Sequence, residues 1–162
     1  PPGIRQLPVS FLCPSLADST ARNCSATMTY PPDQPAQLEA TGVTARNVLG
    51  GPLQVCSCAP LTGWFRNGYC QTDPADLGRH TVCCVVNEAF LSYTRAQGND
   101  LSTPAPAWGF PGLRPGDGWC ICANRWLEAY EDGMAPPVRL EACEISTLEL
   151  IPLEVLQRRA AV

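Results

Sequence analysis

The chain has 162 residues and a formal net charge of −4 at pH 7. This length is sufficient for the core of one domain with an extension, and the acidic balance excludes nucleic-acid binding through a basic surface. Because no apolar run approaches the roughly 20 residues of a membrane helix, we expect neither a nucleic-acid partner nor a direct membrane span.

Residues 1–46 are rich in proline and hydroxyl side chains and show little hydrophobic periodicity. Such a segment does not bury enough apolar surface to fold alone, so we expect an extended arm. Residues 1–30 include Arg5 and Arg22 but a single acid, Asp18, which is typical of an organelle-targeting sequence. Together with a first residue that is not Met, this favours a eukaryotic organelle, mitochondrion or plastid, with a cytoplasmic location as the alternative.

Residues 47–162 are expected to form the compact domain. Glycine and proline interrupt its first part, up to Gly78, so often that only short strands fit. One such strand is expected at residues 64–66, before a turn at Asn67-Gly68.

A strand followed by a helix comes next. Residues 81–86 (TVCCVV) are a continuous apolar run, typical of a strand covered on both faces. Asn87 is suited to cap a helix through Gln97, and Gly98 is suited to end it.

The second half repeats this order. We expect a strand at 119–122, a helix at 124–132 ended by Gly133, a strand at 138–143, a short helix with Ser146 and Glu149 in capping-box spacing, and a terminal helix from Pro152 to about residue 159. This order indicates an α+β fold, a two-layer sandwich in which helices cover one face of a small mixed sheet.

A loop of about twenty residues, 98–118, separates the two halves, and long loops in compact domains are often functional. Its prolines restrict the backbone, and Trp108 and Phe110 offer apolar anchors. The favoured interpretation is a structural cover over the core. The alternative is a preformed interaction loop that displays Asn99 and Asp100 beside the two aromatic residues.

The chain contains 10 cysteines, several of them in close pairs. Strand residues at i and i+2 lie about 6.6 Å apart, near the upper limit for a disulfide, so a bridge between Cys120 and Cys122 would be strained. Bridges between distant cysteines remain open and cannot be assigned from sequence. The favoured role of the cysteines is that of small buried apolar side chains.

Several short motifs occur in a distinctive order. They are NVLGGPL (47–53), LTGWFRNGYC (61–70), DLGRHTVC (76–83), QGNDLSTP (97–104), GFPGLRPGDGWCICANRW (109–126), APPVRLEA (135–142) and IPLEVL (151–156). Over residues 47–160 the chain resembles domain of unknown function family 2237, best known from bacteria. The resemblance implies a small α+β domain and no established activity, substrate or cofactor.

The resemblance also covers a set of thiols and the imidazole. Residues at positions where the family tends to carry them are Cys56, Cys70, His80, Cys83, Cys120 and Cys122. Thiolates and one imidazole are suitable zinc ligands, so four of this set could hold zinc. The spacing lacks the paired Cys-x-x-Cys motifs of a standard zinc finger.

The second chemical alternative is a nucleophilic cysteine, which needs a cation, an imidazole or a helix N-terminus to stabilise the thiolate. His80 lies three residues before Cys83, but in an extended strand the two would face opposite sides. Cys120 is the better candidate, because it precedes a predicted helix and has Arg125 nearby. Cys122 shares the same segment.

Two functions follow. The favoured one is a non-catalytic accessory subunit of a larger assembly, without a cofactor, that docks on other protein subunits through residues 1–46 and the loop surface. The alternative is a small cysteine-based enzyme or a zinc-binding module. The sequence has neither a phosphate-binding loop nor a pair of carboxylates with catalytic spacing, so an enzyme is the less favoured prediction.

Overall fold

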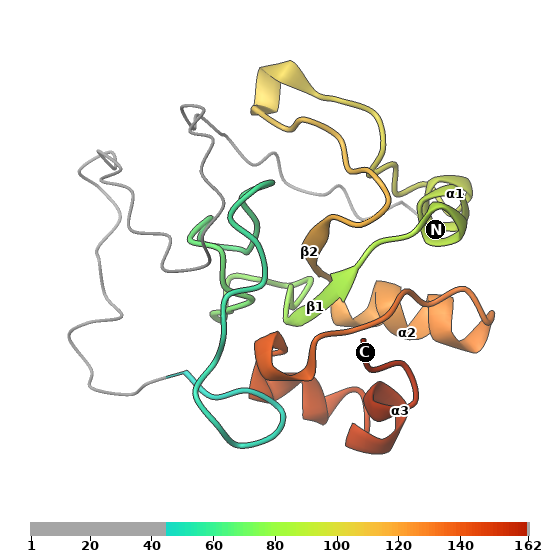
Figure 1. Cartoon of the computed structure of the whole chain (residues 1–162). Helices are drawn as coiled ribbons and strands as arrows, with labels where there is room; N and C mark the ends of the chain where they lie inside the picture. Colours follow the sequence, from blue (N-terminus) through green and yellow to red (C-terminus); the bar gives the residue numbers. More distant parts are fainter. Residues whose placement is uncertain (1–44, 162) are drawn as a thin grey trace, which may run out of the picture.

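The computed structural model describes residues 45–161 (Figure 1). The α-helices and strands are β1 (Val82–Val85), α1 (Glu88–Ala96), β2 (Gly118–Ile121), α2 (Ala123–Glu131) and α3 (Leu153–Gln157). Three short 3-10 helices occupy Pro106–Trp108, Leu140–Ala142 and Ile145–Glu149. The predicted α+β class is confirmed. The predicted arm at 1–46 lies, apart from its last two residues, outside the described residues.

The centre of the domain is the antiparallel ribbon of β1 and β2, in which Val82 pairs with Ile121 and Cys83 with Cys120. The apolar run of β1 and the sequence GWCI of β2 are almost entirely buried, as expected for strands covered on both faces. Val138 extends the ribbon through an antiparallel bridge to Cys84 and makes a parallel bridge to Ala160. The sheet is therefore small, and the pairing around it is mixed.

The two longer helices begin and end for local reasons. The Asn87 side chain accepts a hydrogen bond from the Phe90 amide at 2.8 Å, which caps the N-terminus of α1. Gly98, with φ of 82°, and Gly133, with φ of 74°, follow α1 and α2 in the left-handed conformation that ends helices. Both ends agree with the sequence-based prediction.

The core lies between the ribbon and these helices. Trp126 on α2 is fully buried, and its indole nitrogen donates to the Pro136 carbonyl at 3.1 Å. Phe90 on α1 is also fully buried, and α1 packs against α2. One continuous cluster of buried side chains therefore joins the ribbon to both helices.

Two predicted strands are absent from the described residues. In place of a strand at 138–143, the Ala142 amide bonds to the Arg139 carbonyl and forms a 3-10 turn. In place of a strand at 64–66, the Arg66 amide bonds to the Gly63 carbonyl. In the first segment only Val138 keeps bridge pairing, and in the second the local hydrogen bond takes the place of the expected strand pairing.

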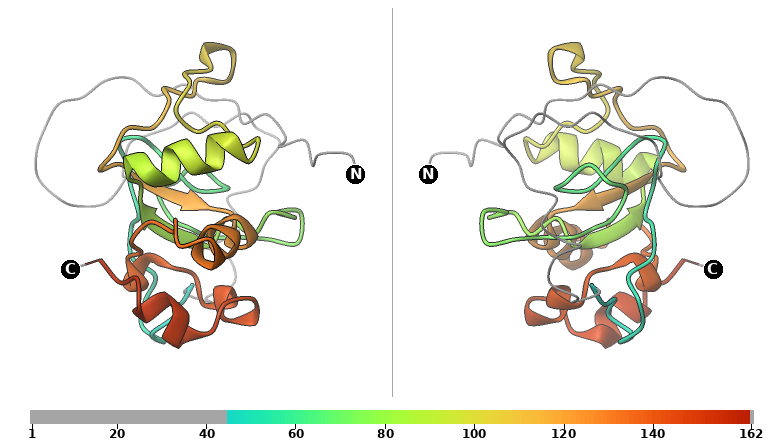
Figure 2. Two further views of the ribbon diagram at one scale, coloured as in Figure 1. Left: turned by 90° about the vertical axis from the view of Figure 1, so that its right-hand side faces the viewer. Right: turned by 90° about the vertical axis from the view of Figure 1, so that its left-hand side faces the viewer.

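The loop between α1 and β2 lies at one end of the molecule, and the C-terminal segment from residue 140 lies at the other (Figures 1 and 2). Over residues 45–161, none of the helices has the length and apolar character required to span a bilayer.

Candidate active site

An imidazole and a thiol meet at one end of the β1–β2 ribbon. In an antiparallel pair, the residues just before the first strand and just after the second lie at the same end of the ribbon. Here the last pair at that end is Val82–Ile121. His80 Nε2 lies 3.1 Å from Cys122 Sγ, although 42 residues separate them in sequence. Cys122 is a free cysteine.

A buried carboxylate holds the other side of the imidazole. Asp76 Oδ1 lies 2.6 Å from His80 Nδ1, and Asp76 Oδ2 accepts from the His80 amide at 2.8 Å and from the Thr72 hydroxyl at 3.0 Å. The Asp76 side chain is fully buried. An imidazole that donates from Nδ1 to Asp76 presents Nε2 to Cys122, so the three side chains form a Cys–His–Asp triad.

The charges in the triad support one another. Burial lowers the pKa of His80, but the hydrogen bonds and negative charges of Asp76 and Cys122 outweigh it and raise the pKa to about 9. Burial raises the pKa of Asp76, but the hydrogen bonds and charge of His80 have the larger combined effect, so the pKa is below its ordinary value. The imidazolium form of His80, hydrogen-bonded to the Asp76 carboxylate, is therefore favoured.

The segment that carries Asp76 and His80 is held by a hydrogen bond to the N-terminus of α2. Arg79 has a φ of 48°, unusual for a residue with a side chain. Its carbonyl accepts from the Ala123 amide at 3.0 Å, the first amide of α2. Gly78 leaves space for the pair, because a Cβ there would lie 2.9 Å from His80 Cε1 and 3.0 Å from Cys122 Sγ. The backbone therefore holds the base against the thiol.

Trp64 covers the imidazole. The two rings stack with centroids 6.0 Å apart and an interplanar angle of 14°. The His80 side chain keeps a quarter of its surface exposed, whereas Cys122 is 9% exposed. The imidazole is therefore the more exposed of the two reactive groups, and Trp64 lies beside it.

Cys122 is also the N-cap residue of α2, and its side chain makes no capping hydrogen bond. The amides of Asn124 and Arg125 in the first turn have no backbone or side-chain acceptor among residues 45–161. They are the donors that an N-cap side chain normally engages. Unpaired amides beside the thiol are suited to bind an oxygen that becomes negative during a reaction.

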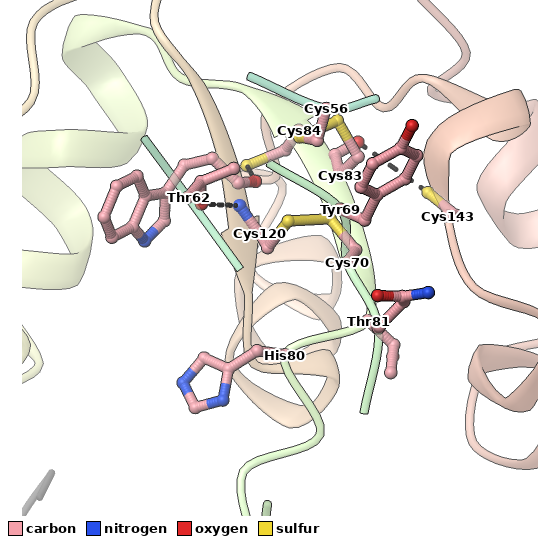
Figure 3. Close-up of a disulfide and its surroundings, with 12 residues drawn as sticks. Cys56, Thr62, Tyr69, Cys70, His80, Thr81, Cys83, Cys84, Cys120 and Cys143 are labelled. Atoms are coloured by element: carbon pink, nitrogen blue, oxygen red, sulfur yellow. Dashed lines mark hydrogen bonds between the residues drawn. A yellow bond between two sulfur atoms is a disulfide. The ribbon is translucent and has the colours of Figure 1, made fainter. Parts of the chain in front are cut away.

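Two other thiol candidates are corrected by the structure. Cys83 is joined to Cys56, and Cys120 is joined to Cys70, with Cα–Cα distances of 5.6 Å and 5.2 Å. Neither Cys83 nor Cys120 is a free nucleophile, because its sulfur is half of a disulfide. Figure 3 shows the two disulfides next to each other on the ribbon, with His80 turned away from them.

The proposed set of zinc ligands is thus divided. The sulfur atoms of Cys56, Cys70 and Cys83 lie within 4.8 Å of one another. His80 and Cys122 belong to the separate triad. The predicted set therefore falls into two separate groups, and zinc binding by four of its members stays a prediction.

The remaining described free thiols are less suited to nucleophilic chemistry. Cys84 and Cys143 are fully buried. Burial raises the pKa of both, that of Cys143 to about 12, which keeps both as neutral thiols. Their side chains donate to the carbonyls of Trp119 and Cys83. They fill the core, as the sequence-based interpretation of the cysteines proposed.

The long loop uses its candidate residues for local contacts. Asn99 donates to the Thr94 hydroxyl at 3.1 Å, and Asp100 accepts from the Thr103 amide and hydroxyl at 3.0 and 2.7 Å. Phe110 packs against Trp119 with centroids 5.5 Å apart, whereas Trp108 is 43% exposed. These contacts fit the structural cover, and a binding role for the loop stays a prediction.

The pairing of His80 with Cys122 and the role of Asp76 were missed by sequence reasoning. Spacing along the sequence points from His80 to Cys83, whereas the partner of His80 lies across a strand pair. The signal was present, because pairing the two predicted strands at 81–86 and 119–122 as antiparallel neighbours brings residue 80 near residue 122. The Asp76–His80 spacing of four residues was a second signal.

The single histidine allows a direct test of these charges by NMR titration. We expect the chemical shift of the His80 Cε1 proton to report an imidazole pKa of about 9, above the ordinary 6.5. Asp76→Asn and Cys122→Ser each remove an interaction that raises it, so each variant should titrate at lower pH. A titration near 6.5 that neither substitution moves would contradict the triad.

A comparison with family models identifies residues 46–160 with the family described as "Uncharacterized protein conserved in bacteria (DUF2237)". No curated protein matches the chain. The bacterial description overturns the prediction of a eukaryotic organelle. Proline, hydroxyl residues and scarce acids are not specific to targeting segments, because extended chains of many kinds share this composition.

Proposed function

Because the chain belongs to the DUF2237 family, whose description assigns no activity, we propose a function from the site: Cys122 is the nucleophile of a cysteine-dependent acyl-transfer enzyme, acting on esters, thioesters or amides. The observation that carries this proposal is the continuous set of contacts from Cys122 Sγ through His80 to Asp76, at 3.1 and 2.6 Å. Nucleophile, base and orienting group in this order are the signature of an activated nucleophile.

In the first half of the reaction, His80 holds the Cys122 proton as the imidazolium, and the Cys122 thiolate attacks the carbonyl carbon. The carbonyl oxygen becomes negative and binds the first-turn amides of α2. As the intermediate collapses, the bond to the leaving group breaks, and His80 gives the proton to that group. The acyl group is then held on Cys122 as a thioester.

In the second half, His80 takes a proton from water, or from another acceptor, which attacks the thioester. The bond between the carbonyl carbon and sulfur breaks, and Cys122 leaves as the thiolate beside the His80 imidazolium, which restores the starting state. Asp76 keeps the imidazole oriented in both halves and stabilises its charged form.

The proposal is tested with p-nitrophenyl acetate as the acyl donor. We expect a stoichiometric burst of p-nitrophenolate and an added acetyl group that peptide mass spectrometry locates on Cys122. Cys122→Ser should lose the burst, and Cys84→Ser should keep it, because Cys84 is free but buried away from the triad.

Gly78→Ala adds a methyl group between His80 and Cys122 without removing either, and it should reduce the burst rate. Gly51→Ala is its control, since a Cβ there finds only ordinary contacts with the Asn47 side chain. Acetylation spread over several cysteines, or a burst that persists in Cys122→Ser, would reject the proposal.

The accessory-subunit function stays a prediction. It depends on residues 1–46, of which only the last two belong to the described residues. Its test is deletion of residues 1–44, which should release the chain from a partner while leaving residues 45–161 folded.

A further inference from the structure

A second cluster of sulfur atoms, separate from the triad, is formed by Cys56, Cys70, Cys83 and Cys120, here called the four-cysteine cluster. Cys83 and Cys120 are directly paired across the ribbon, so their side chains leave the same face. Cys56 and Cys70 approach that face from the loop-rich first half and join them as two neighbouring disulfides (Figure 3). Four sulfur atoms from one ribbon and two loop positions thus meet at one place.

We propose that reduction of both disulfides converts the four-cysteine cluster into a tetrathiolate site for one zinc ion. Three of its sulfur atoms lie within 4.8 Å of one another. Four thiolates about 2.3 Å from zinc in a tetrahedron are separated by roughly 3.8 Å, so these three sulfurs are within about 1 Å of the separations that zinc requires. The fourth, on Cys120, is placed by its bond to Cys70.

The surroundings are those of a closed structural site. Each of the four cysteines has an exposure of 2% or less, which leaves no position open to solvent. The Cys120 amide donates to the Thr62 hydroxyl at 2.8 Å, and the Cys83 carbonyl accepts from the Arg139 amide at 2.9 Å. The Arg139 guanidinium donates to the Cys56 carbonyl at 2.9 Å and brings a positive charge toward a site whose four thiolates and zinc sum to −2.

The conversion is balanced in electrons and protons. A dithiol reductant supplies two electrons and two protons to each disulfide and is itself oxidised to a disulfide. Zinc then replaces the four thiol protons, which pass to solvent. The same four residues connect the loop-rich first half to the ribbon in both states, by S–S bonds when oxidised and by Zn–S bonds when reduced.

The full chain is tested by anaerobic reduction, removal of the reductant and titration with cobalt(II) and then zinc. The reduced chain should bind one equivalent of cobalt with the visible absorption and sulfur charge-transfer bands of a tetrahedral thiolate site, and zinc should displace it. X-ray absorption of the zinc form should show sulfur neighbours only, at about 2.3 Å. The oxidised chain should bind neither metal at this site.

Cys56→Ser should weaken zinc binding at least 100-fold, whereas Cys84→Ser and Cys122→Ser should leave it unchanged. If Cys56→Ser does not fold when reduced, the X-ray absorption of the unsubstituted chain decides, because nitrogen or oxygen neighbours would reject a four-sulfur site. Failure of the reduced chain to bind cobalt, or binding that depends on Cys122, would also overturn the proposal. Because Cys122→Ser removes acyl transfer but not zinc, the two proposals can fail separately.

Discussion

Replacement of His80 by asparagine is expected to slow acylation of Cys122 by p-nitrophenyl acetate by roughly 10²- to 10⁴-fold, the usual contribution of a general base. Asparagine keeps a polar side chain but does not accept the thiol proton or carry the positive charge that faces Cys122 at 3.1 Å. The measurement is the single-turnover rate of p-nitrophenolate release, with Glu154→Gln, an exposed change on α3, as the control for altered charge.

The pH dependence of the same reaction separates the two roles of His80. Its imidazolium is present below a pKa of about 9 and is lost above it. An anilide leaving group needs a proton from His80, so anilide cleavage should fall as the pH rises above 9. p-Nitrophenolate leaves without a proton, so ester acylation should not fall. Equal rates of p-nitrophenolate release from His80→Asn and from the unsubstituted chain would contradict the mechanism.

Replacement of Gly63 by alanine is expected to lower the free energy of unfolding by about 3 kcal/mol. Gly63 has a φ of 95°, and a Cβ at this position would overlap the Tyr69 carbonyl oxygen. The substitution therefore adds a collision with backbone to the cost of the left-handed conformation. It also displaces the loop that carries Trp64 and Cys70, so thiol reactivity at Cys122 should change with it.

Gly98→Ala is the matched control for Gly63→Ala. Gly98 has a similar φ of 82°, but a Cβ there finds nothing within 4 Å. It should cost only the backbone term, about 1 kcal/mol. Urea unfolding with the disulfides intact measures the two losses, and equal losses would show that the loop accommodates the methyl group.

The regular elements of the second half could be predicted because their signals are local. Asn87 and Gly98 bound α1, and Gly133 ends α2, by hydrogen bonds and backbone angles within a few residues. The first half could not be predicted in this way. Its shape depends on disulfides from Cys56 and Cys70 to partners 27 and 50 residues away, and spacing alone does not assign such pairs.

The candidate site was predicted in composition but not in arrangement. The sequence predicts His80 and Cys122 among the candidates for thiol chemistry, but it favours Cys120 as the nucleophile. Cys120 lies inside β2, where its side chain faces Cys83 and reaches Cys70, whereas Cys122 lies beyond the strand at the start of α2. A difference of two residues separates a cross-link in the core from a free thiol beside a base, and the local sequence does not encode that difference.

The pairing of β1 with β2 has a consequence for the refolding of the chain. His80 precedes one strand and Cys122 follows the other, so their contact exists in a single alignment of the two strands. A slip of one residue would turn the side chains of one strand to the opposite face and separate base from thiol. The rate at which Cys122 is alkylated during refolding therefore reports strand alignment. Alkylation should become fast when the correct alignment forms, and chains trapped in a shifted alignment should remain unlabelled.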